Sequence, residues 1–267
     1  MNYGKSNLSR RKKRISSKKR MKKKRVGVRL FKAFVLCILL LGIVGVAAGG
    51  VFVKHVIDNT PEVTAKDILP QGYTTSIVDQ NGTVLEQLKD SDSNRVYKKY
   101  DEISKYMGDA FVAIEDERFY KHNGIDLQGI IRAGVVGVTH GFHFTEGAST
   151  LTQQLIKNNV LQGGYETSMA DKLRRKIQEQ FLAVKLEDQL DSKETILEYY
   201  LNTINLGGNC LGVQTAAHRY FGKNVWELTL SECTVLAATT SNPSRYSPLT
   251  HPKENAVRRK IVLEKMY

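Results

Sequence analysis

Cysteine is scarce in this chain, with three residues among 267. Cys37 lies inside a long uncharged run, and Cys210 and Cys233 stand in the C-terminal quarter of the chain. Two cysteines without motif spacing are more often free thiols than a disulfide, so the chain is not a disulfide-rich scaffold. No pair of Cys or His residues has zinc-finger spacing, so no structural zinc site is expected.

Acidic residues are missing from the first 32 positions, which carry fifteen Lys or Arg. The rest of the chain has 25 basic against 27 acidic residues, so the formal charge of +13 belongs to this basic tail, residues 1–32. Basic tails can bind nucleic acid. The segment that follows explains the charge differently, and no nucleic-acid partner is expected.

Charge is also missing from residues 33–53, a run of twenty-one residues between Lys32 and Lys54. About 20 apolar residues span a bilayer as a helix, so the sequence predicts one transmembrane helix here. A cleaved signal peptide is the alternative, because Val46-Ala47-Ala48 resembles a cleavage site. The long basic lead and the length of the run favour an uncleaved anchor in the cell membrane. The Lys and Arg excess predicts a cytoplasmic N-terminus beside anionic lipid, with everything after Lys54 extracellular or periplasmic.

A linker, a β-rich segment and a helical segment follow this helix. Residues 54–72 read as a linker, and residues 73–88 hold two β-rich runs around Asn81-Gly82. Asn-Gly supplies the positive φ angles of a type I′ turn, so these runs predict a β-hairpin. From Asp101 to residue 267 the pattern is helical, with glycine-rich loops between helices.

The first stretch that carries chemistry is Ala113–Asp126, AIEDERFYKHNGID. It reads as a helix that ends in a turn at Asn123-Gly124. On such a helix Glu115, Phe119 and His122 would share one face. A carboxylate beside an aromatic ring and an imidazole suits general-base chemistry. A charged surface helix is the alternative for this stretch alone.

The second stretch is Glu146–Asn159, EGASTLTQQLIKNN. Ser149 reads as the N-cap of a helix, with Leu151 and Leu155 available for the core. Ser149, Gln153 and Lys157 would share a face that offers a hydroxyl, an amide and an ammonium group to sugar and phosphate oxygens. An ordinary capped surface helix remains the alternative.

The third stretch is Lys172–Glu187, in which Leu173, Ile177 and Val184 predict a helical apolar stripe. Arg175 and Lys176 lie one turn before Glu179. These three residues are either salt bridges along a helix or a cationic patch for a diphosphate, with Glu179 holding the cations or a divalent metal.

The remaining helical patterns read mainly as scaffold. A helix is expected to begin near Ser192 and to place Leu197, Tyr200 and Leu201 in the protein core. Thr229 with Glu232 predicts a capping box, and Pro252 suits the first turn of a last helix.

Five motifs follow one another in order along the chain: EDERFYKHNG, GASTLTQQLIKN, RRKIQE, ILEYYLN with GVQTAAHRYFGK, and LTLSECTVLA followed by NPSRYSPL. This order closely resembles the peptidoglycan glycosyltransferase family, which includes the glycosyltransferase module of class A penicillin-binding proteins and the monofunctional transglycosylases. The resemblance covers Ile68 to the C-terminus. It implies a mainly α-helical, lysozyme-like domain at 73–267 with a small jaw that dips into the membrane. The apolar stretch Ile130–Phe144 falls where that jaw lies, with ordinary core as the alternative.

The resemblance also implies a reaction, the polymerisation of lipid II into β-1,4 glycan strands with inversion and release of undecaprenyl diphosphate. Glu115 would be the base that takes the proton of the acceptor hydroxyl, and Glu179 would be the second essential carboxylate, beside a loosely bound Mg²⁺ or Mn²⁺. The implied substrate-binding residues are Asp116, Ser149, Thr150, Gln153, Gln154, Lys157, Arg175 and Lys176. The implied partners are lipid II, the growing glycan strand and membrane lipid, with other cell-wall synthesis proteins as further candidates.

Two other functions fit parts of the pattern. A lysozyme-like hydrolase would use the same two carboxylates, but a neutral leaving group has no use for the cations at Lys157, Arg175 and Lys176. A non-catalytic membrane scaffold would not need Glu115 and Glu179. The S-x-x-K, S-x-N and K-T-G set of a transpeptidase does not follow the five motifs. The chain therefore reads either as a monofunctional enzyme or as the front part of a longer protein.

Overall fold

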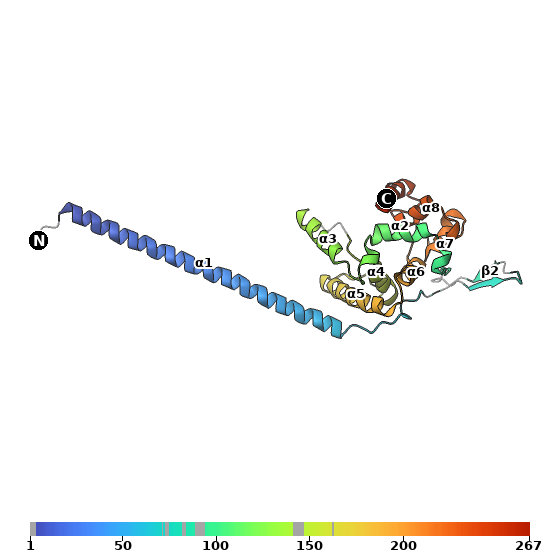
Figure 1. Cartoon of the computed structure of the whole chain (residues 1–267), viewed down its shortest axis with the longest axis horizontal. Helices are drawn as coiled ribbons and strands as arrows, with labels where there is room; N and C mark the ends of the chain where they lie inside the picture. Colours follow the sequence, from blue (N-terminus) through green and yellow to red (C-terminus); the bar gives the residue numbers. More distant parts are fainter. Residues whose placement is uncertain are drawn as a thin grey trace. The chain divides into compact units, whose positions relative to one another are not determined.

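The computed structural model describes residues 4–70, 72, 75–81, 84–88, 94–140, 147–161 and 163–267. The chain forms two units, Met1–Asp58 and Asn59–Tyr267 (Figure 1). The predicted fold class is confirmed: the chain is mainly helical, with one apolar N-terminal helix and one small hairpin.

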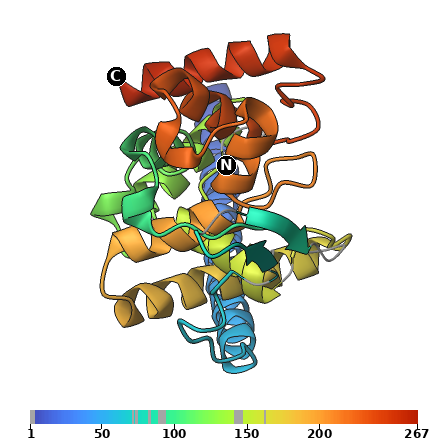
Figure 2. The same cartoon turned by 90° about the vertical axis from the view of Figure 1, so that its right-hand side faces the viewer.

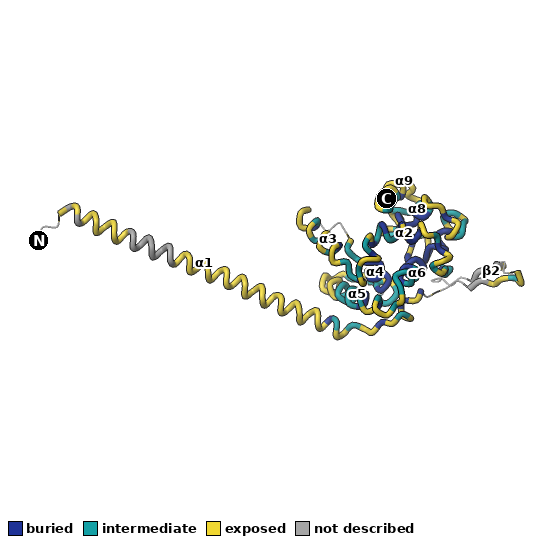
Figure 3. Tube along the Cα trace, viewed as in Figure 1, coloured by how far each residue is buried: buried dark blue, intermediate teal, exposed yellow. Residues whose placement is uncertain are grey.

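The first unit consists of a single helix, α1, Lys5–Asp58. Its part Val26–Asp58 contains an 18-residue stretch with a mean hydropathy of 2.7 and is long and apolar enough to cross a membrane. Apolar side chains such as Phe34, Leu41 and Val46 are exposed along it (Figure 3). Water would not favour such a surface, whereas lipid would.

The hairpin pairs β1, Thr75–Val78, with β2, Val84–Leu88. The strands are antiparallel, Thr75 faces Leu88, and the register shifts between Ile77 and Val78. The predicted hairpin is therefore present. The type I′ turn predicted at Asn81-Gly82 includes a residue that lies outside the described part of the chain.

Eight helices follow the hairpin within the described residues. They are α2 Lys105–Glu115, α3 Leu127–Thr139, α4 Leu151–Ile156, α5 Met169–Gln189, α6 Lys193–Thr203, α7 Val213–Phe221, α8 Leu230–Thr239 and α9 Pro252–Met266. A π-helical turn, Lys157–Leu161, continues α4. The predicted capping box at Thr229 and Glu232 opens α8, and Pro252 occupies the first turn of α9.

The core lies where α2, α4, α6 and α8 meet. α2 packs against α8 and α9, and α4 packs against α5 and α6. Figure 2 shows α9 lying across one end of the unit above α8, and Figure 3 shows buried residues gathering on the central helices. The expected core residues Leu151, Leu155, Leu197, Tyr200 and Leu201 are all buried.

Part of the predicted linker belongs to this core. Val63 and Ile68 are buried against it, and Asn159 donates a hydrogen bond to the Ile68 carbonyl. Cys210 and Cys233 are buried free thiols, as the sequence suggested.

The prediction of one helix over Ala113–Asp126 is wrong. α2 ends at Glu115, and Asp116 leaves the helical region with φ −155°. Only one short 3-10 turn follows, Phe119–Lys121, so Glu115, Phe119 and His122 share no helix face. The cause is tertiary: the Asp116 carboxylate accepts from the backbone N–H of Leu151, which a continuing helix would not place within reach.

Two smaller predictions, one about the N-cap of α4 and one about the buried face of α5, were also wrong. The N-cap of α4 is Thr150 rather than Ser149, because the Thr150 hydroxyl accepts from the N–H of Gln153. The Ser149 hydroxyl accepts from Lys176 instead. On α5 the buried side consists of Glu179, Leu182, Ala183 and Leu186, whereas Leu173 is exposed.

Helix α3 presents an apolar face to its surroundings. Leu127, Ile131, Val135 and Val138 recur at helical spacing, and each has more than half of its surface exposed. The interpretation of Ile130–Phe144 as ordinary core is therefore wrong for these α3 side chains, while residues 141–146 lie outside the described part of the chain.

Candidate active site

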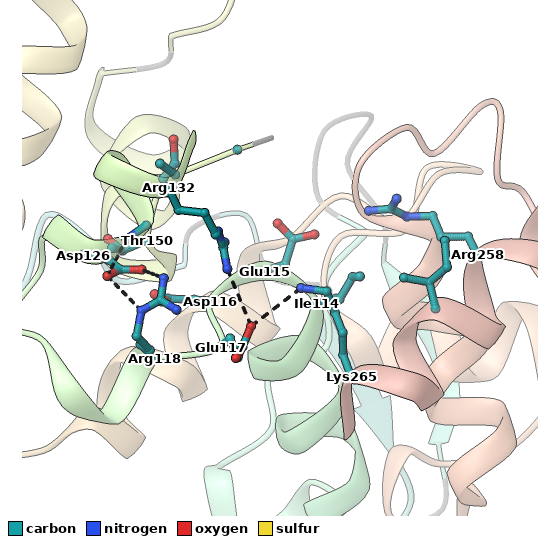
Figure 4. A pocket seen from close by; sticks show the side chains of 15 residues that line it. Ile114, Glu115, Asp116, Glu117, Arg118, Asp126, Arg132, Thr150, Arg258 and Lys265 are labelled. Atoms are coloured by element: carbon teal, nitrogen blue, oxygen red, sulfur yellow. Dashed lines mark hydrogen bonds and ion pairs between the residues drawn. The ribbon is translucent and has the colours of Figure 1, made fainter. Parts of the chain in front are cut away.

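A pocket of about 540 Å³ opens between the C-terminal end of α2, α3, the start of α4, and α9. Acidic side chains come from the end of α2 and the loop after it, which also supplies Arg118, and further basic side chains come from α3 and α9 (Figure 4). Glu117 lies between Arg132, at 3.9 Å, and Lys265, at 4.0 Å. The pocket therefore holds both signs of charge at its rim, around the end of α2 that carries Glu115.

Glu115 is half-buried at the last position of α2, and each of its oxygens has a donor. Gln154 Nε2 donates to Oε2 over 3.0 Å, and the Thr240 hydroxyl donates to Oε1. The Tyr200 hydroxyl donates in turn to the side-chain oxygen Oε1 of Gln154 over 3.1 Å. A carboxylate oxygen can accept more than one bond, so both oxygens keep capacity for a substrate hydroxyl.

Tyr200 is a neutral donor in this arrangement. Burial raises the pKa of its phenol well above the ordinary range, and the nearby charges of Glu115 and Asp116 act in the same direction. Its ring packs edge-on to Phe111 with the centroids 6.0 Å apart. The phenol is therefore both fixed and protonated, which fixes the amide of Gln154.

A second pocket, of about 780 Å³, lies next to these supporting residues. Gln154 and Thr240 line it, together with Lys157, Asn158 and Tyr165. Within the described part of the chain the Lys157 ammonium has no ion-pair partner. Glu115 thus lines the first pocket, and both of its donors line the second, which also offers a cation and several amides.

Asp116 does not extend freely into the first pocket. It is 6 % exposed, and its carboxylate accepts from the Leu151 N–H and from His122 Nε2, both at 2.9 Å. The Gly124 N–H donates to His122 Nδ1, so the imidazole proton lies on Nε2 and points to Asp116. Asp116 therefore fastens the first motif to the start of α4, and His122 holds the Asp116 carboxylate in place.

Thr150 and Gln153 are also engaged inside the protein. Gln153 is 1 % exposed, and its Nε2 donates to the Gly124 carbonyl at 3.0 Å. The Thr150 hydroxyl donates to the same carbonyl at 2.9 Å. Gly124 has φ +89°, and a Cβ there would lie 2.7 Å from the Ala183 backbone. The predicted glycine turn is present, and it joins the first motif to α4 and α5.

Glu179 is fully buried and lies between two cations. Arg175 Nη1 and Lys176 Nζ bind its two oxygens, the latter at 2.6 Å, and Lys176 also donates to Ser149. Arg175 reaches Glu166 at 2.7 Å. The sequence left two roles open for this cluster, and the contacts correspond to Glu179 holding the cations.

The expected divalent cation does not fit this donor set. Mg²⁺ and Mn²⁺ prefer several oxygen ligands, whereas Glu179 supplies one carboxylate whose oxygens already bind two cations. Among the described residues, no cluster of three Asp, Glu, His or Cys side chains could hold a metal ion. We therefore derive no step of the reaction through a metal.

Reasoning from the sequence missed Thr240 and the supporting role of Tyr200. Thr240 stands 125 residues from Glu115, and nothing in its local pattern distinguishes it from a capping threonine. It also missed the ion pair between Arg118 and Asp126, whose closest atoms are 2.5 Å apart. The Arg118 hydrogen bond lowers the pKa of Asp126, and the carboxylate caps α3 through the N–H of Gly129.

Comparison with known proteins agrees with the motif order. The family model described as Transglycosylase matches residues 81–267. The chain is 40 % identical over 249 residues to penicillin-binding protein 1A of Clostridium perfringens, 39 % identical over 242 residues to that of Escherichia coli, and 36 % identical over 252 residues to penicillin-binding protein 1A/1B of Bacillus subtilis. These alignments cover 90 %, 90 % and 94 % of the chain, but only 35 %, 27 % and 26 % of the relatives.

The crystal structure of penicillin-binding protein 1A from Haemophilus influenzae aligns at 21 % identity over 74 % of this chain and 18 % of that one. Its TM-score of 0.37 is too low to compare the two folds in detail. The family model covers most of the chain, and its range contains all five motifs and both pockets. The chain therefore belongs to the transglycosylase family, the peptidoglycan glycosyltransferase family found in class A penicillin-binding proteins.

Proposed function

We propose that this chain is a membrane-anchored peptidoglycan glycosyltransferase that polymerises lipid II into β-1,4 glycan strands. One observation carries the proposal: Glu115 lines one pocket, and the two donors that hold it line a second. Polymerisation requires two sugar substrates beside one base, and a pair of adjoining pockets provides room for both.

Glu115 would act as the general base. It accepts the proton of the acceptor's 4-hydroxyl while that oxygen forms a bond to C1 of the donor. The bond between C1 and the diphosphate oxygen breaks, and undecaprenyl diphosphate leaves with the electron pair. Attack from the face opposite the leaving group inverts C1.

The leaving diphosphate needs positive charge rather than a strong acid. Lys157 supplies an ammonium free of ion pairs within the described residues, and Lys176 keeps 40 % of its side-chain surface exposed while bound to Glu179. Charge-assisted contacts of this kind stabilise the charge that develops on a leaving phosphate. Ser149, bonded to Lys176, lines the first pocket and would complete the anion contact.

We infer supporting roles for other predicted site residues from the contacts that they make. Asp116, Thr150 and Gln153 hold the loop after α2 against α4, and Gln154 orients Glu115. Arg175 and Glu179 form a buried pair that fixes Lys176. These residues would act on the substrate through the groups that they position.

A position at the membrane surface would suit an enzyme whose substrate is linked to a lipid. α1 would anchor the chain with its basic end in the cytoplasm, and the exposed apolar face of α3 would lie in the outer surface of the bilayer. Both features would keep the pockets near the undecaprenyl chain of the substrate.

A hydrolase is disfavoured by the state of Glu179. A glycosidase needs a second carboxyl group that can reach the substrate and donate a proton, but Glu179 is fully buried and its two oxygens are bound to Arg175 and Lys176.

The products distinguish the two activities. The purified chain in liposomes with lipid II should yield glycan strands and free undecaprenyl diphosphate. Shortening of preformed strands, with no use of lipid II, would contradict the proposal.

A further inference from the structure

Thr240 is the only one of the two Glu115 donors that can change its partner. Its hydroxyl oxygen is within bonding distance of Glu115 Oε1 and of the Ala237 carbonyl, which lies 3.0 Å away. A hydroxyl carries one proton, so it donates to one of these acceptors at a time. An ionised carboxylate is the stronger acceptor, and it wins while Glu115 is charged.

We propose that Thr240 is a positioning residue for Glu115 that favours the ionised base before the reaction and releases it once it is protonated. This inference rests on the proposed function and adds a residue to it. Protonation of Glu115 removes the charge that held the Thr240 proton. The hydroxyl of the half-buried Thr240 then turns to the Ala237 carbonyl, so its proton keeps an acceptor.

The other donor cannot respond in this way. The Gln154 amide is fixed because Tyr200, which is 1 % exposed, donates to its carbonyl oxygen. Gln154 therefore fixes the direction of the carboxylate through Oε2 in both states, while Thr240 senses its charge through Oε1. Gln154 therefore orients the Glu115 carboxylate, and Thr240 stabilises its charge.

The position of Thr240 is itself well fixed. It is the C-cap of α8 with φ −54° and ψ −48°, and its N–H donates to the Ala237 carbonyl. The adjoining Thr239 accepts from the buried Asn255 of α9. The hydroxyl thus rotates on a backbone that two helices hold in place.

The test is the pH dependence of lipid II polymerisation by Thr240→Val in the full chain. Valine keeps the shape of threonine and lacks the hydroxyl. The variant removes a hydrogen bond that the ionised carboxylate accepts, so the acid limb of the kcat/KM profile should move to higher pH, and kcat should fall about 10- to 100-fold. KM should change less than kcat, because the Thr240 hydroxyl is occupied by Glu115 and Ala237 rather than reserved for the substrate.

Two variants keep this test decisive. Thr240→Ser retains the hydroxyl and should restore the native acid limb. Thr234→Val is the matched control, because Thr234 is buried in the same helix and its hydroxyl also donates to a carbonyl three residues back, at 2.9 Å. It should leave the pH profile unchanged.

An acid limb of Thr240→Val that coincides with the native one would overturn the inference, as would an equal shift in Thr234→Val. Either result leaves the proposed function standing if the native chain makes strands. Failure of the native chain to polymerise lipid II would instead contradict the proposed function.

Discussion

Replacement of Gly124 by alanine tests the joint between the first motif and the helices that carry the other motifs. The residue has φ +89°, and an added Cβ would lie 2.7 Å from the carbonyl carbon and oxygen of Ala183 and 2.9 Å from the nitrogen of Val184. These are backbone atoms of α5, which cannot move aside as a flexible side chain would. The Gly124 carbonyl also accepts from Thr150 and Gln153, so a shift here breaks two buried bonds.

The magnitude follows from comparison with a second glycine. Gly222 has φ +64° with nothing within 4 Å of an added Cβ, so Gly222→Ala should cost only the strain of a left-handed conformation, about 1 kcal/mol. Gly124→Ala adds the collision, which brings its expected cost to about 3 kcal/mol. For a unit of this size that corresponds to a loss of roughly 6–12 °C in Tm.

The fluorescence of Trp226, the only tryptophan in the chain, reports unfolding of the Asn59–Tyr267 unit in detergent. Gly124→Ala should melt well below Gly222→Ala, and it should also lose polymerisation, because the loop carries Asp116 and follows Glu115. Equal losses of Tm in the two variants would refute the reasoning.

Two further predictions concern buried charge. Glu179→Gln leaves Arg175 and Lys176 without their carboxylate, so the free energy of unfolding should fall by about 3 kcal/mol, with polymerisation reduced at least about 100-fold; a change in stability of less than about 0.5 kcal/mol in a urea titration would show that the pair is not buried as described. Asp126 has a pKa lowered by the Arg118 hydrogen bond, so its contribution to stability is present above the unfolded-state pKa and is lost as pH falls through the folded-state pKa. The difference in urea midpoint between the native chain and Asp126→Asn should therefore be full at neutral pH and shrink below about pH 4, and a difference independent of pH would contradict this origin.

Local rules predicted the elements of this fold where neighbours in sequence decide the structure. The capping box at Thr229, the glycine turn at Gly124 and the buried leucines of α4 depend on residues within one or two turns. The motif order predicted the family without any geometry.

The failures share a cause at longer range. α2 stops at Glu115 because Asp116 is bonded to a backbone N–H that lies 35 positions away. Thr240 meets Glu115 only after α8 has packed against α2. The buried side of α5 includes Glu179, because two cations neutralise the carboxylate and so lower the free-energy cost of burying it. A search for apolar residues at helical spacing does not detect a buried carboxylate of this kind.

The most direct test of the central claim is polymerisation of lipid II in liposomes by Glu115→Gln beside the native chain. Glutamine keeps the size of the side chain and removes the base, so the variant should fold as the native chain does and form strands at least about 1,000-fold more slowly. Glu264→Gln is the matched control, because this exposed carboxylate on α9 makes a long surface pair with Lys260 and lines neither pocket within the described residues, and it should polymerise at the native rate. Strands formed by Glu115→Gln at the rate of that control would show that Glu115 is not the base.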